Sequence, residues 1–137
     1  MSIDSNELNL FSFKDYKTKC RVVDVYDGDT CTIIFKYRNE IIKYKVRCYG
    51  YDSPEMKPKR DIENRDEIIK KAKEAREYFS NLVHYNSGLI WVHLHEFDKY
   101  GRLLGTFYKN ETSEKSINDI MIENGYGYSY FGGTKKN

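Results

Sequence analysis

The chain consists of short stretches of strand-like residues interrupted by one long helical stretch. Residues 19–27, 30–37 and 41–51 are rich in β-branched and aromatic side chains, and apolar and polar positions alternate in the third stretch. The sequences LIWVHLHEF and RLLGTFYK predict two more strands, joined by the turn DKYG. We therefore expect five strands in a mainly β fold that also contains helices.

Helices are predicted after the third and fifth strands. Residues 65–84 carry apolar side chains at helical spacing, which predicts one long helix packed on the sheet, and Asn64 and Glu67 have the spacing of a capping box. Residues 117–124 predict a short helix with Ser116 as its N-cap. The predicted apolar face of the long helix is Ile68, Ala72, Ala75, Phe79 and Leu82. This order of elements indicates an α+β protein built on a five-stranded OB-fold barrel.

The length of 137 residues predicts one barrel domain with two flanking segments. Residues 1–16 are polar and mildly acidic, and we expect a flexible N-terminal arm that docks a few apolar side chains. Residues 17–131 form the predicted domain, and residues 132–137 form a basic C-terminal tail. No stretch is long and apolar enough for a membrane span. The first residues lack the features of a signal peptide, which predicts an intracellular, cytoplasmic protein.

Net charge and cysteine content restrict the function only weakly. A formal net charge of +2 does not by itself indicate a nucleic-acid-binding protein, so any basic surface must be local. The three cysteines form no CxxC pair. Cys31 and Cys48 alternate in register with apolar residues, so we expect them in the core as reduced thiols.

Two aspartates flank the second and third predicted strands. Asp29 precedes the second strand in DGDT, and Asp52 follows the third strand. If these strands pair as a hairpin, the start of one lies near the end of the other, and the two carboxylates can converge. Two carboxylates with a backbone carbonyl suit a hard cation such as Ca²⁺ or Mg²⁺. The alternative is that both aspartates only cap local turns.

Further charged residues lie close to these aspartates in the sequence. Arg47, at the exit of the third strand, suits a bidentate phosphate clamp or else a surface ion pair with Asp52 or Glu55. Glu55 follows a proline in a loop and is a candidate to accept a proton from water. The turn DKYGR, which ends at Arg102, is either a second cationic arm of the same site or an ordinary hairpin turn.

Three motifs occur in order: DGDT at residues 27–30, VRCYGYDSPE at residues 46–55 and DKYGR at residues 98–102. With a predicted helix between the last two motifs, the chain resembles the thermonuclease, or staphylococcal-nuclease, family over about residues 18–131. The resemblance implies an OB-fold nuclease domain and a Ca²⁺-dependent endonuclease that hydrolyses phosphodiester bonds of DNA and RNA.

The resemblance also implies roles for single residues. It assigns the metal carboxylates to Asp29 and Asp52, and a metal-binding backbone carbonyl to Ser53, where the family usually has threonine. The catalytic set that it implies is Arg47, Glu55 and Arg102. The substrate-binding residues that it implies are Lys99, Tyr100, Tyr128 and Tyr130. Glu55 would be the base, and the two arginines would stabilise charge in the transition state.

Substrate preference follows from the residues expected around this site. Aromatic side chains that stack on bases, with a cationic rim from residues 57–60 and 135–136, predict a preference for single-stranded or frayed nucleic acid. We expect a monomer without a membrane partner.

Two other functions remain open. An OB barrel can bind single-stranded nucleic acid without chemistry, although a pure binder needs no set of two aspartates, two arginines and a glutamate. His93 and His95 share a strand face and would bind Zn²⁺ if a cysteine joined them. Against zinc, no fourth ligand is evident, and two histidines on the surface of a sheet are the simpler interpretation.

Overall fold

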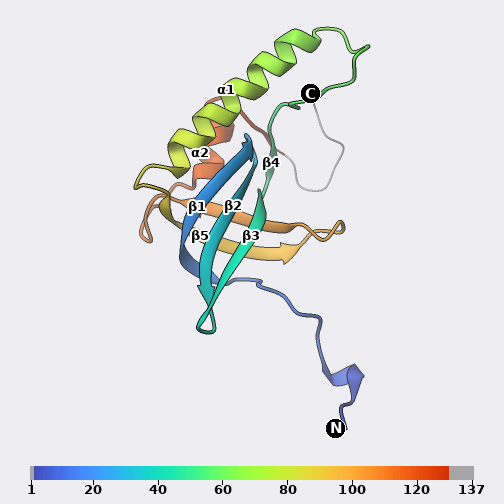
Figure 1. Ribbon diagram of the computed structural model, residues 1–137, viewed down its shortest axis with the longest axis vertical. Coiled ribbons are helices and arrows are strands. Elements are labelled where there is room, and N and C mark those ends of the chain that lie inside the picture. The colour runs from blue at the N-terminus through green and yellow to red at the C-terminus, as the bar shows by residue number, and fades with distance from the viewer. Residues whose placement is uncertain (1, 130–137) are drawn as a thin grey trace.

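The computed structural model describes residues 2–129, and its strands and helices follow the predicted order (Figure 1). A short 3₁₀ helix, η1 (Ser5–Glu7), precedes the first strand. The remaining elements are β1 (Lys17–Asp27), β2 (Thr30–Tyr37), β3 (Glu40–Cys48), β4 (Tyr51–Asp52), α1 (Arg65–Val83), β5 (Leu89–Phe97), β6 (Leu103–Tyr108), α2 (Ile117–Glu123) and β7 (Tyr128–Ser129).

Within the described residues, five strands close into a barrel in the order β1-β2-β3-β6-β5. β1 pairs antiparallel with β2 and β5, while β3 and β6 run parallel where the barrel closes. The short strands β4 and β7 pair with each other outside this sheet. The long helix α1 comes after β3 and the short helix α2 after β6. The predicted α+β architecture, a five-stranded OB-type barrel with two helices, is confirmed.

The inward side chains of the strands form the core, as the alternation in the sequence predicts. Ile33 and Phe35 on β2 and Val46 on β3 are fully or almost fully buried. The three cysteines are free thiols and all are buried. Burial raises the pKa of Cys20 to about 12, which keeps this thiol protonated.

The start of α1 differs from the predicted capping box. Asn64 adopts a left-handed backbone conformation with φ of 63°, and its side chain caps no backbone N–H of the helix. The Ser116 cap of α2 is confirmed, because its Oγ accepts a hydrogen bond of 2.9 Å from the Asp119 backbone N–H. On α1, Ala72, Ala75 and Phe79 are buried as expected, whereas Ile68 and Leu82 are only partly covered. Neither of the two described α-helices could cross a membrane.

The third strand ends earlier than predicted. β3 stops at Cys48, and Gly50 takes a φ of 89°, which turns the chain out of the barrel. Tyr51 and Asp52 then form β4, which pairs with β7 instead of extending β3. The sequence could not reveal this break, because residues 49–51 have strand-like composition and the partner strand lies about 75 residues further on.

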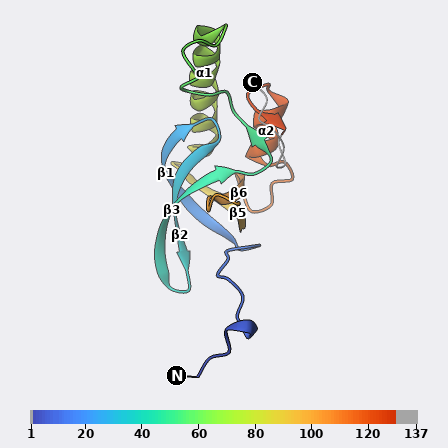
Figure 2. The ribbon, with the colours of Figure 1, turned by 90° about the vertical axis from the view of Figure 1, so that its right-hand side faces the viewer.

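The two ends of the barrel carry different segments. Both views have α1 and α2 at one end and the β2–β3 hairpin with the N-terminal residues at the other (Figure 1), and Figure 2 shows those residues leading away from the barrel. Phe13 is 5% exposed and packs edge-to-face on Phe35 and Tyr37 at ring distances of 5.5 and 5.1 Å. Leu10, three residues earlier, is 95% exposed. Contact with the core therefore begins near Phe13.

Candidate active site

The β2–β3 hairpin brings the start of β2 next to the end of β3. Thr30 is opposite Arg47 in the register, and the Cys48 backbone N–H donates to the Asp29 carbonyl at 2.7 Å. The break after β3 then returns the chain at Asp52 toward the same point. Both aspartates contact the same atom, Nη2 of Arg47. Two carboxylates distant in the sequence thus meet at one guanidinium.

Arg47 is held rigidly between these carboxylates. It is 8% exposed, and its Nη1 donates to the carbonyls of Cys48 at 2.9 Å and Tyr51 at 3.0 Å. Its Nη2 is ion-paired with Asp52 and lies 3.5 Å from Oδ2 of Asp29. The expected ion pair between Arg47 and Asp52 is present, but it is buried and does not lie on the surface. A buried pair in which one partner is removed is costly, since the other charge is left uncompensated.

Asp29 is 4% exposed and receives several hydrogen bonds. Its carboxylate accepts from the Ser53 backbone N–H and from Thr30 Oγ1, both at 2.9 Å. Burial acts to raise the pKa of Asp29, but the Arg47 charge and these hydrogen bonds outweigh burial and lower it below its usual range. Asp29 does not cap the DG turn. That role belongs to Asp27, whose Oδ1 accepts from the Asp29 backbone N–H at 3.0 Å.

Asp27 is a site residue that the sequence analysis did not select. It lines a hollow of about 400 Å³ together with Glu55, Lys57 and Lys59. Burial raises the pKa of Asp27 to about 6, and the negative charge of Asp29 contributes to this shift. The signal was present in the Asp-Gly-Asp sequence, because two carboxylates within one turn lie close enough to interact when one is buried and the other partly buried.

Tyr51 and Gly28 lock the two loops together. The Tyr51 side chain is fully buried, and its hydroxyl donates to the Gly28 carbonyl at 2.7 Å. A Cβ on Gly28 would lie 2.8 Å from Cβ of Ser53 and 3.0 Å from Cβ of Ala75, so only glycine fits here without movement. Sequence patterns gave no signal for Tyr51, because one tyrosine among 13 does not reveal a hydrogen bond to a residue 23 positions away.

The donor set of this cluster fits a hard divalent cation. Asp29 and Asp52 face a single guanidinium, so two buried negative charges are balanced by one positive charge. Ser53 Oγ is buried without a hydrogen-bond partner among the described residues. In residues 2–129, no three His, Cys, Asp or Glu side chains gather closely enough to hold a metal. A Ca²⁺ ion would therefore need backbone, water or phosphate oxygens besides the two carboxylates.

Glu55 lies in the loop after β4, on the wall of the hollow that Asp27 also lines. Its side chain is half-buried and makes no hydrogen bond or ion pair with any residue in the described range. A carboxylate with both oxygens uncommitted at the wall of a hollow is able to accept a proton from water.

The turn between β5 and β6 forms a separate cluster. Nε of Arg102 donates to Oδ2 of Asp98 at 2.7 Å, and Oδ1 of Asp98 accepts from the backbone N–H groups of Tyr100 and Arg102. Burial acts to raise the pKa of Asp98, but these hydrogen bonds outweigh burial and lower it. Lys99 Nζ and Arg102 Cζ lie 5.2 and 5.4 Å from the centre of the Tyr100 ring. The turn matches an ordinary hairpin turn with Gly101 at φ of 79°.

Within residues 2–129, the turn forms no hydrogen bond or ion pair with the buried carboxylates, although β6 starts directly after Arg102 and runs beside β3, with Leu104 opposite Arg47. Among the described residues, no hydrogen bond or ion pair joins Arg102 to Asp29, Asp52 or Glu55. The Arg102 side chain is 51% exposed, and the β5–β6 hairpin projects from the side of the barrel (Figure 1). The predicted site therefore consists of a buried part and an exposed turn, and the pairing of β6 with β3 places the end of this turn near Arg47.

The remaining predicted residues lie in different places. Tyr128 on β7 pairs with Asp52, and Lys71 of α1 lies over its ring at 5.4 Å. Tyr130 and the tail at 132–137 lie outside the described residues. His93 and His95 share a face of β5, as predicted. Their Nε2 atoms are hydrogen-bonded to Asp15 at 2.9 Å and to Thr106 at 2.8 Å.

Comparisons with known proteins identify the family of this chain. The family model described as staphylococcal nuclease homologue matches residues 45–137. Two curated relatives from Oryza sativa subsp. japonica, named probable staphylococcal-like nucleases CAN3 and CAN2, are each 26% identical over 119 residues, or 85% of this chain. The chain spans 27% of the first relative's length and 28% of the second's. The match to the family model covers more than half of the sequence, and the chain belongs to the staphylococcal nuclease homologue family.

Proposed function

We propose that this domain is a Ca²⁺-dependent endonuclease that hydrolyses phosphodiester bonds in DNA and RNA. The observation that carries the proposal is the meeting of two buried carboxylates, Asp29 and Asp52, at the buried guanidinium of Arg47. Family membership and the relatives named as nucleases support the same reaction class.

Ca²⁺ would be held by the carboxylates of Asp29 and Asp52 and the backbone carbonyl of Ser53. Bound there, the ion would supply a Lewis acid for a phosphate oxygen. The excess of buried negative charge in the cluster supports this assignment, because a divalent cation would compensate it.

Glu55 accepts the proton of the attacking water in this proposal. Its uncommitted carboxylate at the wall of the 400 Å³ hollow supports that role. Arg47 stabilises the charge that develops on phosphorus, and two backbone carbonyls already fix its orientation, so little reorganisation is needed. Arg102 provides a second positive charge from the β5–β6 turn, and it must exchange or share its bond to Asp98 when substrate binds.

The substrate is proposed to be single-stranded or frayed nucleic acid. Tyr100 is 72% exposed on the β5–β6 turn, and its ring would stack on an unpaired base in place of the Lys99 or Arg102 side chain that now lies over it. Lys57 and Lys59, exposed at the rim of the hollow, are suited to contact phosphates. Faster cutting of single-stranded than of stiff duplex DNA is expected, and equal rates would contradict this preference.

The test is digestion of single-stranded DNA by the purified protein, in Ca²⁺ and in excess chelator. Cutting should require Ca²⁺ and should fall by roughly 10²–10⁴ in Glu55→Gln, because the general base is lost. Glu63→Gln is the matched control, since Glu63 is exposed in the same loop and makes no described contact. Unchanged cutting by folded Glu55→Gln would contradict the assigned base.

A binding module without catalysis is the second candidate. The observation that favours it is that Arg47 and Arg102 both already have carboxylate partners within the protein. Tight binding of single-stranded DNA with no cutting in any divalent cation would support this alternative against the nuclease.

A further inference from the structure

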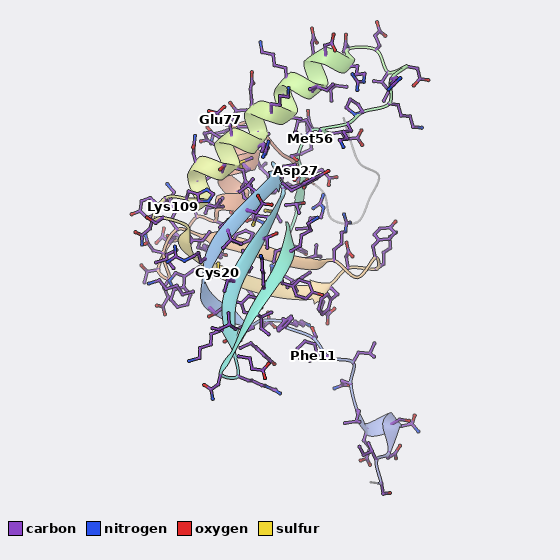
Figure 3. All side chains as sticks on the ribbon, viewed as in Figure 1. Phe11, Cys20, Asp27, Met56, Glu77 and Lys109 are labelled. Carbon is purple, nitrogen blue, oxygen red and sulfur yellow. The ribbon has the colours of Figure 1, made fainter. Side chains whose placement is uncertain are left out.

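Three hollows that share lining residues lie next to one another and lead away from the candidate active site. The first, of about 400 Å³, is lined by Asp27, Glu55 and Lys57 among others. The second, of about 270 Å³, shares Tyr26, Met56 and Lys57 with the first. In Figure 3, Asp27 and Met56 lie close together beneath α1. The row of hollows therefore starts where Glu55 is and continues along β1.

The third hollow extends this row between β1 and α1. It has a volume of about 540 Å³ and shares Asp24, Val25 and Arg76 with the second hollow. Its far part is lined by Lys73 and Glu77 of α1. We call the three hollows together the α1–β1 groove. From Asp27 to Val23 it follows four residues of β1, a length of roughly 13 Å.

Cations outnumber anions along the groove beyond the catalytic residues. Lys57, Lys59, Lys73 and Arg76 line it, against Asp24, Asp27 and Glu77 when the proposed base Glu55 is left aside. All four cations are exposed, and no ion pair of the described residues uses any of them. Unpaired cations in a row along a groove attract a polyanion, and the attraction depends on salt.

The groove also offers a flat apolar surface and a fixed cation. The Tyr26 ring is 52% exposed, and Lys45 Nζ lies 5.1 Å from its centre. Arg76 is anchored at the rim, because its Nε donates to the Val25 carbonyl at 3.4 Å. A half-exposed phenol ring in the same hollow as Arg76 suits a nucleobase joined to phosphates, since a base can stack on the ring while its phosphates meet the cations of the groove.

We propose that the α1–β1 groove is an extended binding site for the nucleic-acid strand on one side of the bond that is cut. It takes the phosphodiester backbone on Lys57, Lys73 and Arg76 and one base on Tyr26. Because stacked nucleotides are spaced by about 3.4 Å, a groove of this length holds roughly four of them. The proposal rests on the proposed function in that Glu55 marks the end where cutting occurs.

The test is the affinity for oligothymidylates of two to twelve nucleotides, measured by fluorescence anisotropy in chelator so that no strand is cut. For the wild-type protein, affinity should rise with length up to about four nucleotides, the number that the groove holds, and then level off. The double variant Lys73→Ala/Arg76→Ala should bind the twelve-nucleotide strand about tenfold more weakly. The slope of log Kd against log salt should fall by about 1.4, since each phosphate contact contributes about 0.7 for a single strand.

Matched variants separate the groove from general effects. Lys36→Ala removes an exposed charge on β2 near the β2–β3 hairpin, at the opposite end of the barrel from α1, and should keep the wild-type length dependence. Arg76→Lys keeps the charge and should retain most of the affinity. Tyr26→Ala should weaken binding about fivefold or more, because a stacked base is lost. Thermal unfolding of each variant checks that loss of the Arg76–Val25 hydrogen bond has not unfolded the protein.

Several results would contradict the proposal that the α1–β1 groove binds the nucleic-acid strand. One is a wild-type affinity that does not depend on strand length. Another is a folded double variant whose affinity and salt dependence equal those of the wild type. Equal displacement of the strand by hexaglutamate would also overturn it, because the site would then respond to charge alone. Cutting is measured separately in Ca²⁺. Length-dependent binding without any cutting would support the proposed groove and contradict the proposed nuclease activity. Cutting in Ca²⁺, together with normal binding by the double variant, would support the nuclease activity and contradict the groove.

Discussion

The buried cluster around Arg47 and the turn at residues 98–102 carry two parts of one proposed chemistry, yet their surroundings are opposite. Arg47 is 8% exposed and is fixed by two backbone carbonyls and two carboxylates. The Arg102 side chain is 51% exposed, and its one carboxylate partner lies in the same turn. The first arginine depends on the fold of the whole barrel, and the second depends on a local hairpin.

This difference indicates which part is preorganised. The charges of the buried cluster are already desolvated and oriented, so they act on a substrate without much rearrangement. Arg102 and Asp98 lie near the surface, where ion pairs contribute little to stability and water competes for them. We therefore expect substitutions in the buried cluster to change stability and activity together, and substitutions in the turn to change activity almost alone.

The largest effect is expected for Arg47→Ala. Removing the guanidinium leaves Asp29 and Asp52 buried without a counter-charge, which should cost about 3–5 kcal/mol of unfolding free energy. Urea denaturation in chelator measures this loss. Arg47→Ala combined with Asp52→Asn should recover part of it, because one of the two unpaired charges is gone. A loss below about 1 kcal/mol would mean that the ion pair is not buried as described.

Arg102→Ala should abolish most activity while leaving the fold intact. Loss of one donor to the developing charge typically lowers kcat by roughly 10²–10³. The unfolding free energy should change by less than about 0.5 kcal/mol, since the side chain is half exposed. The kcat of Arg102→Lys should lie between that of the wild type and that of Arg102→Ala, because lysine keeps the positive charge but lacks the planar guanidinium group. Normal turnover by a folded Arg102→Ala protein would remove Arg102 from the site.

A pair of glycine substitutions compares the two regions directly. Gly28→Ala puts a Cβ 2.8 Å from Ser53 in the buried cluster, so it should cost about 1–3 kcal/mol and also lower activity. Gly101→Ala in the turn meets no atom within 4 Å, but its φ of +79° costs about 1 kcal/mol in backbone strain. Thermal unfolding and cutting rates of both variants test this. Equal losses of activity in Gly28→Ala and Gly101→Ala would contradict the preorganisation of the buried cluster around Arg47.

The smallest effect is expected for Asp98→Asn. The side-chain oxygen that caps Tyr100 and Arg102 is kept, and only the charge opposite Arg102 is lost, so stability should fall by less than about 1 kcal/mol. The folded-state pKa of Asp98 is lowered below 3.8, so its contribution is present above pH 3.8 and is lost as the pH falls through the lowered pKa. A stability difference from wild type that grows on acidification would contradict this.

Much of the fold followed from local patterns. β5 has the predicted bounds, and the Ser116 cap of α2 is confirmed, because alternation and capping are properties of neighbouring residues. Two predictions of local structure failed, each for its own reason. Asn64 is a residue type that often caps helices, but its backbone is left-handed and its side chain makes no capping hydrogen bond. Residues 49–51 have the composition of a strand, yet they leave the barrel to pair with β7.

Sequence alone determined the residue types of the candidate site and their order along the chain. DGDT, VRCYGYDSPE and DKYGR, in that order with a helix between the last two, indicate the family. The register of the β2–β3 hairpin and the turn at Gly50 decided that Asp29 and Asp52 share one buried arginine. Tertiary packing engaged Tyr51 with Gly28, placed three hollows side by side along α1 and supplied the burial that raises the pKa of Asp27. Burial and convergence are properties of pairs of segments far apart in the chain, so no local pattern encodes them.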